Sequence, residues 1–169
     1  MKKQKGFSLI ELLIVVAIIL IIAAIAIPNL LRSKMAANES SAVGSLRTLT
    51  TAQSTYSSMY NVGFATTYVE LGPGNSTCAT GDLIDAVLAS GSKSGYTFPP
   101  MVTLPNNTPA GILASTGCAD GASAYSINAN PVQCDGTGHR TFFVNATAVI
   151  RFNAAAGCPA SGAASTPLQ

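Results

Sequence analysis

The chain has 169 residues, of which only 9% are charged, and its formal net charge is +2 at pH 7. This length suggests one modest globular domain together with a helical extension. The near-neutral charge excludes a strongly basic surface of the kind that grips nucleic acid, so no nucleic-acid partner is expected.

A long apolar segment near the N-terminus dominates the sequence. The 16 residues from 12 to 27 contain no polar side chain, and Glu11 is the only charged residue between Lys5 and Arg32. A helix over residues 7–31 would span about 37 Å at about 1.5 Å per residue, enough for a bilayer core of about 30 Å. Three lysines precede the segment, so its N-terminal end is expected to stay cytoplasmic.

Three interpretations of this segment are open. A cleaved secretory signal has a shorter apolar region and a small-residue cleavage site, whereas this run is long and ends at Ile27-Pro28-Asn29. A single-span anchor explains the length and the lysines, but it leaves Glu11 unexplained. The third interpretation is a spanning helix with a functional role for Glu11, because a carboxylate within such a helix is costly unless it is paired. Since no group in the same helix can pair with Glu11, the N-terminal amine of a neighbouring chain is a good candidate.

The segment Gly6-Phe7-Ser8-Leu9-Ile10-Glu11-Leu12 resembles the prepilin motif of type IV pilins and of type II secretion pseudopilins. The resemblance is close over residues 5–60 and looser beyond them. It implies that a membrane-embedded prepilin peptidase cuts after Gly6 and N-methylates Phe7. It also implies that Glu11 meets the Phe7 amine of an adjacent subunit during assembly. Because breaking a buried ion pair is costly although the pair adds little net stability, this contact is expected to set the register between subunits.

We expect one helix from about residue 7 to residue 60, after a leader peptide at residues 1–6. Residues 7–28 would form the transmembrane and filament-core half, and Pro28 predicts a kink. Residues 29–60 would form an amphipathic half whose apolar stripe buries against a sheet. The stripe comprises Leu31, Met35, Ala42, Leu46, Leu49, Tyr56 and Tyr60. The opposite, polar face is assigned Arg32, Lys34, Asn38, Glu39, Ser45, Arg47, Thr48 and Thr51.

Residues 61–94 are expected to form a connecting loop with one short helix. Asp82 would cap a helix over residues 83–89, and Asp85 would lie in its first turn. This interpretation is favoured over a calcium site at the two aspartates.

Residues 95–169 are expected to form an antiparallel sheet and a C-terminal disulfide region, which makes the fold class α+β with a long N-terminal helix packed on a small sheet. Three or four strands are predicted, at residues 96–98, 124–129, 141–144 and 148–152. The last two would be joined by a hairpin turn at residues 145–147. One face of the sheet would cover the helix and the other would stay polar. The tail from residue 154 is expected to be partly mobile and tied down only by Cys158.

The four cysteines, Cys78, Cys118, Cys134 and Cys158, all follow the apolar segment. An even number in an exported domain indicates disulfides, and three pairings are possible. We favour Cys78–Cys118 with Cys134–Cys158, because each bond would close a loop next to the predicted sheet. The sequence contains neither C-x-x-C nor clustered histidines, so no metal site is expected.

No enzymatic motif stands out in the sequence. His139 is the only histidine and is expected in a surface loop, and the G-x-S-x-G motif of a serine hydrolase is missing. Gly136-Thr137-Gly138 is too short for a phosphate-binding loop. We therefore expect neither catalysis nor a cofactor.

The resemblance favours a major type IV pilin-like subunit. Such a chain would reside in the inner membrane, meet prepilin peptidase and the pilus assembly machinery there, and polymerise with its own copies into an extracellular filament, or fimbrium. The first alternative is a major pseudopilin of a type II secretion system. Calcium binding near the C-terminus is common in those proteins, whereas no Asp or Glu follows Asp135 here. The second alternative is a membrane-anchored periplasmic domain that never assembles.

Overall fold

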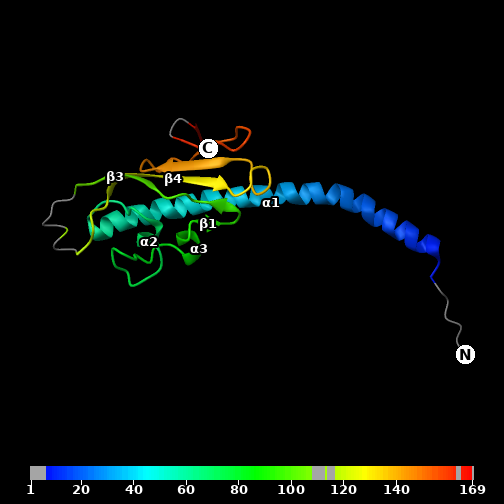
Figure 1. Ribbon diagram of the computed structural model, residues 1–169, viewed down its shortest axis with the longest axis horizontal. Helices are drawn as coiled ribbons and strands as arrows, with labels where there is room; N and C mark the ends of the chain where they lie inside the picture. Colours follow the sequence, from blue (N-terminus) through cyan, green and yellow to red (C-terminus); the bar gives the residue numbers. More distant parts are fainter. Residues whose placement is uncertain (1–6, 108–112, 114–116, 163–164, 169) are drawn as a thin grey trace, which may run out of the picture. The chain divides into compact units, whose positions relative to one another are not determined.

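The computed structural model describes residues 7–107, 113, 117–162 and 165–168. The chain divides into two compact units, Met1–Lys34 and Met35–Gln169. Helix α1 (Leu9–Tyr60) contributes to both units, and the sheet of the second unit lies along the C-terminal part of this helix (Figure 1). The single long helix expected from about residue 7 to residue 60 is therefore confirmed, with Leu9 as its first residue. It ends where Asn61 (φ 56°) and Gly63 (φ 97°) adopt the left-handed backbone that commonly terminates helices.

The C-terminal part of α1 belongs to the second unit and buries one face in its core. The buried residues of the helix are Glu39, Ala42, Ser45, Leu46, Leu49, Ala52, Gln53 and Tyr56. Four residues of the predicted apolar stripe are among them. The assignment of Glu39 and Ser45 to the polar face was wrong, because both side chains lie in the buried interface.

The segment between α1 and the sheet holds two short helices, α2 (Tyr68–Leu71) and α3 (Ala86–Ala89), instead of the single helix expected. The predicted cap of the second was also wrong. Asp85 is the capping residue, with Oδ1 accepting a hydrogen bond from the Leu88 amide at 2.7 Å. Asp82 has a left-handed backbone (φ 56°), unlike the extended backbone of a capping residue. The hydrogen bonds from Lys93 and from the Leu88 amide lower the pKa of the Asp85 carboxyl.

In the part of the chain that the structure describes, seven strands form one antiparallel sheet, which is more than the three or four expected. The strands are β1 (Ser92–Lys93), β2 (Tyr96–Thr97), β3 (Val102–Pro105), β4 (Ala122–Pro131), β5 (Thr141–Asn145), β6 (Arg151–Asn153) and β7 (Thr166–Pro167). Their order is β1-β2-β4-β5-β6-β7, and β3 also pairs with β4. The strand expected at residues 148–152 begins only at Arg151, because Ala148 (φ 61°) belongs to a turn closed by its amide on the Asn145 carbonyl.

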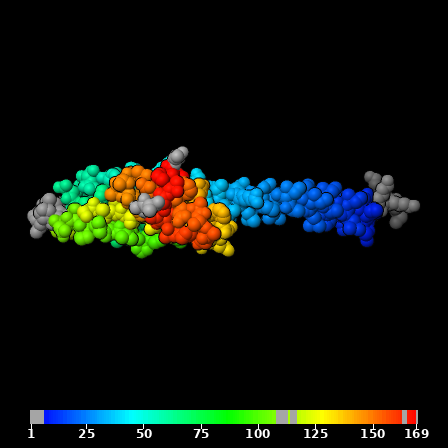
Figure 2. Space-filling view, turned by 90° about the horizontal axis from the view of Figure 1, so that it is seen from above, coloured from blue at the N-terminus to red at the C-terminus, as the bar shows by residue number. Residues whose placement is uncertain are grey.

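The two faces of the sheet are covered differently. Tyr125, Ile127 and Ala129 of β4 are buried at alternate positions and belong to the same apolar core as the stripe of α1. The outer face is covered in part by the C-terminal segment, since the Thr141 hydroxyl of β5 donates to the Pro159 carbonyl at 2.7 Å and lies 2.8 Å from the Ser161 hydroxyl, within hydrogen-bond distance. Figure 2 shows the C-terminal segment, in orange and red, on the surface of the second unit.

The described part of the tail is held by more than its cysteine, which corrects the expectation of a tail tied only at Cys158. Strand β7 pairs with β6, and the Leu168 amide donates to the Ile150 carbonyl at 2.8 Å. The Arg151 guanidinium also donates to the Ser165 carbonyl at 3.1 Å.

Candidate functional site

The start of α1 holds the residues that the sequence singles out. Phe7 and Ser8 precede the helix, and Glu11 lies in its first turn. The Ser8 amide donates a hydrogen bond of 2.9 Å to Oε2 of Glu11. Residues 8–11 match the S-x-x-E pattern of a capping box, in which the glutamate reaches back to the amide of the capping residue. This hydrogen bond comes from Ser8, which precedes the helix, so it does not contradict the expectation that no group of the helix itself pairs with the charge of Glu11.

This hydrogen bond leaves the charge of Glu11 uncompensated. The Ser8 amide is neutral, and among the residues that the structure describes no ion pair involves Glu11. A carboxylate accepts several hydrogen bonds through its two oxygens. Oε1 can therefore receive a cationic nitrogen while Oε2 stays bound to Ser8.

The apolar part of α1 is exposed around its whole circumference. Phe7 is 79% exposed, and from residue 7 to residue 34 every side chain is exposed except the half-buried Ala23. A helix that is apolar on all sides requires apolar surroundings on all sides, either lipid or other helices. By length and composition, α1 is the one helix in the described part of the chain able to cross a membrane.

Two of the predicted features remain predictions. Gly6 and the leader peptide lie outside the described residues, so the bond between Gly6 and Phe7 is not seen. Pro28 lies inside α1, and the helix continues on both sides of it. The kink at this residue stays a prediction.

Within the second unit, a buried carboxylate holds the C-terminal part of α1 against the loop before β5, and no pattern in the sequence indicated it. Oε1 of Glu39 accepts from the backbone amides of His139 at 2.8 Å and Arg140 at 3.1 Å. Oε2 accepts from Nε of Arg140 at 2.7 Å and lies 2.7 Å from its Nη2. The two residues are 101 positions apart, so no local pattern relates them. The same guanidinium lies 5.8 Å from the ring centroid of Phe142 and 5.5 Å from that of Phe152, within cation–π range.

Other polar contacts strengthen this attachment. Asn38 donates from Nδ2 to the Thr137 carbonyl at 2.8 Å, one residue before Glu39. Burial, with the Glu39 carboxylate as a second cause, raises the pKa of Tyr96, whose hydroxyl donates to the Arg140 carbonyl at 2.7 Å. The loop before β5 is thus bound to α1 through its backbone as well as its side chains.

Gln53 makes a second buried connection further along α1. Its side chain is fully buried, its Oε1 accepts from the Ala65 amide at 2.8 Å, and its Nε2 donates to the Ala65 carbonyl at 3.0 Å. One amide side chain therefore satisfies both backbone groups of a buried loop residue.

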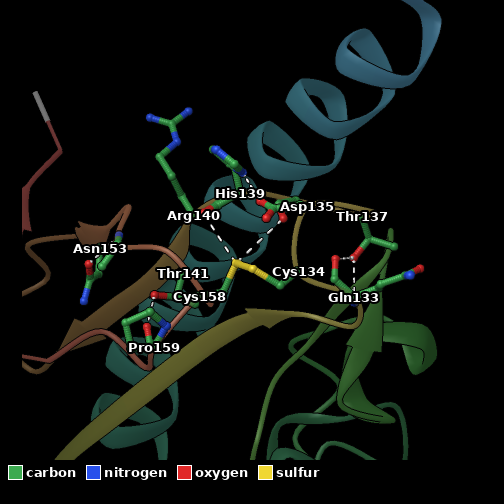
Figure 3. The surroundings of a disulfide bond; sticks show 12 residues. Gln133, Cys134, Asp135, Thr137, His139, Arg140, Thr141, Asn153, Cys158 and Pro159 are labelled. Carbon is green, nitrogen blue, oxygen red and sulfur yellow. Dashed lines mark hydrogen bonds and ion pairs between the residues drawn. A yellow bond between two sulfur atoms is a disulfide. The ribbon is translucent and has the colours of Figure 1, made fainter. Parts of the chain in front are cut away.

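The structure pairs the four cysteines as Cys78–Cys118 and Cys134–Cys158, the two bonds favoured above. Figure 3 shows the second bond with the neighbouring ion pair of Asp135 and His139. The sulfurs of Cys134 and Cys158 lie near an Asp135 oxygen, within 4.8 Å, but sulfurs joined in a disulfide supply no thiolate ligands to a metal. His139 is exposed in a loop, as expected.

Comparison with known proteins bears on the first part of the chain. Residues 1–27 match the family described as "Prokaryotic N-terminal methylation motif". This segment is therefore a prepilin-type motif, as the resemblance implied. The α+β architecture, a long N-terminal helix with an antiparallel sheet, is consistent with a type IV pilin fold.

Two curated relatives are type IV pilus proteins. The "Type IV major pilin protein PilA" of Myxococcus xanthus is 50% identical over 54 residues, which make up 32% of this chain and 24% of the relative. The "Type IV wide pilus major component PilA4" of Thermus thermophilus is 62% identical over 39 residues, 23% of this chain and 30% of the relative. The matches thus span less than a third of either relative. No solved structure matches the chain.

Proposed function

We propose that this chain is the precursor of a structural subunit that polymerises into a type IV pilus-like filament. The proposal rests on one observation: the methylation motif of residues 1–27 opens onto a helix whose apolar side chains are exposed on every side. Outside a membrane each large aliphatic side chain left in water costs about 1.5–3 kcal/mol relative to burial. A filament removes this cost by packing the helices of many copies into a common core.

In this proposal Glu11 pairs with the Phe7 amine of the neighbouring subunit. Cleavage after Gly6 frees that amine, and N-methylation leaves it cationic. The Ser8 amide keeps Oε2 of Glu11 occupied, and Oε1 faces the incoming nitrogen. A charged pair in an apolar helix bundle tolerates little misplacement, because a copy held out of register leaves a carboxylate without its cation. The pair therefore selects the axial position of each subunit.

The proposed route begins in the inner membrane. The chain crosses it once with its N-terminus in the cytoplasm, where Lys2, Lys3 and Lys5 remain until prepilin peptidase removes them. The pilus assembly machinery then transfers the mature chain into the extracellular filament. Replacing Gly6 by valine should leave the leader attached, and a product of mature mass in this variant would contradict the cleavage site.

The assembly step can be tested with Glu11→Val in cells that make the chain with its peptidase and assembly machinery. The variant should insert into the membrane, but fibres should be lost from the fraction sheared off the cells. Asp82→Asn removes an exposed carboxylate from the second unit and serves as the control, which should form fibres normally. Normal fibre formation by Glu11→Val would contradict the pairing.

A pseudopilin is the second candidate function, since the motif is common to both classes. Both curated relatives are named as major pilus components, and this favours the pilin. Long fibres sheared from cells would also separate the pilin from a membrane anchor that never assembles.

A further inference from the structure

Two cations follow the apolar part of α1 and project from opposite sides of it. Arg32 and Lys34 are both exposed, and among the described residues neither takes part in an ion pair. Successive residues of an α-helix are turned by about 100°, so side chains two residues apart point about 200° apart. A single protein partner lies on one side of a helix and would meet only one of them. A partner that surrounds the helix can bind both.

The spacing of the charges along α1 matches the thickness of a membrane. Twenty residues without charge, 12–31, separate Glu11 from Arg32. The corresponding rise is about 31 Å, against a hydrocarbon core of about 30 Å. A helix in this position can place Glu11 at one edge of the hydrocarbon and Arg32 at the other. The long stems of arginine and lysine then reach the head groups.

We propose that Arg32 and Lys34 bind the phosphate groups of phospholipids in the leaflet where α1 leaves the membrane, and that this contact sets the insertion depth of the unassembled chain. The inference rests on the proposed function, because it concerns the membrane-inserted state that precedes assembly. Guanidinium and ammonium groups both bind phosphate well, the former through paired N–H donors. Lipid head groups surround the helix, so they can contact Arg32 and Lys34 on its opposite sides.

This depth changes the role of Glu11. In the membrane its carboxylate lies at the cytoplasmic edge of the hydrocarbon, where water and the Ser8 amide solvate it. It becomes surrounded by apolar side chains only when the helix leaves the lipid for the filament. The Phe7 amine of the neighbouring subunit is therefore needed when the helix enters the filament. The unassembled chain is stable in the membrane without this amine.

The natural absence of tryptophan allows a direct measurement of depth. Leu31→Trp gives the full chain a single indole, whose position in phosphatidylglycerol vesicles is read by quenching with lipids brominated at known acyl positions. In the R32Q/K34Q background the indole should move toward the bilayer centre by about 4–5 Å, the rise of the three apolar residues 35–37 that follow. The control R47Q/K93Q removes the same charge from the second unit and should leave the depth unchanged.

An unchanged indole depth in R32Q/K34Q, or an equal shift in R47Q/K93Q, would overturn the inference. The exchange R32K/K34R keeps both cations and should keep the parent depth, so a shift there would also count against it. Fibre formation is measured separately, in cells that express the same variants without the tryptophan. If the parent chain forms fibres but the indole depth does not change in R32Q/K34Q, this inference alone is overturned. If the depth changes as expected but the parent chain never forms fibres, the proposed function alone is overturned.

Discussion

The ion pair of Glu39 with Arg140 offers a sharp test of how the C-terminal part of α1 is held within the second unit. The perturbation is Glu39→Gln, which keeps almost the same shape. The amide oxygen can still accept from the backbone amides of His139 and Arg140. The amide nitrogen, however, replaces the oxygen that now faces the guanidinium, so that two donors oppose each other.

The magnitude follows from the burial of the two partners. Breaking a buried pair costs about 3–5 kcal/mol, whereas an exposed pair contributes about 0–1 kcal/mol. The Glu39 side chain is 8% exposed and that of Arg140 is 40% exposed, which places this pair between the two limits. We expect the free energy of unfolding to fall by about 2 kcal/mol. For a chain of this length the melting temperature should fall by about 4–8 °C.

The assay is thermal unfolding of the full chain in detergent micelles, followed by circular dichroism. Arg47→Gln removes an exposed cation from the same helix and should change the free energy of unfolding by less than about 0.5 kcal/mol. Glu39→Gln, Arg140→Gln and their combination complete a double-mutant cycle, with an expected coupling energy of about 1 kcal/mol or more. A Glu39→Gln variant as stable as Arg47→Gln, or strictly additive effects in the cycle, would refute the reasoning.

Three further predictions concern the second unit. Gln53→Leu leaves the backbone amide and carbonyl of Ala65 unpaired, so the free energy of unfolding should fall by about 2–3 kcal/mol. If this variant were as stable as the exposed control Thr51→Ala, Gln53 would not hold the Ala65 backbone as described. Burial raises the pKa of Tyr56 to about 12 from its usual value of 10.0, so the unfolded chain ionises first and stability is lost as pH rises from 10 to 12. Tyr56→Phe should lose stability less steeply over that interval in pH-dependent denaturant titrations, and an unchanged slope would contradict the assignment. Replacing Cys134 and Cys158 by alanine opens a loop with a sequence separation of 24, so the free energy of unfolding should fall by about 3 kcal/mol. An unchanged denaturant midpoint in the same titrations would argue against this disulfide.

The long helix could be predicted from sequence because its signals are local and repeated. An unbroken apolar run followed by spacings of three and four specifies a helix and its buried stripe without knowledge of the partner. The positions of β4 and β5 followed in the same way from alternating and apolar segments. The two disulfides were favoured because each closes a loop beside those strands, and the structure contains both.

The remaining features depend on contacts that local patterns do not encode. A glutamate on a polar helical face is normally solvated, and contacts with the His139 amide and with Arg140, 100 and 101 residues away, make burial of Glu39 favourable. Strands of two residues, such as β1, β2 and β7, are too short for a periodic pattern and exist because neighbouring strands complete their hydrogen bonds. Asp82 and Asp85 are alike as capping residues in sequence, and the backbone conformation decides between them.

The central claim is that this chain loses its leader and is built into a filament through its new N-terminus. Mass spectrometry of the N-terminal peptide from sheared surface fibres tests it most directly. The account predicts a peptide that begins at Phe7 and carries one added methyl group on its amine. A peptide that still contains Lys2, Lys3 and Lys5, or surface fibres that lack this chain, would contradict it.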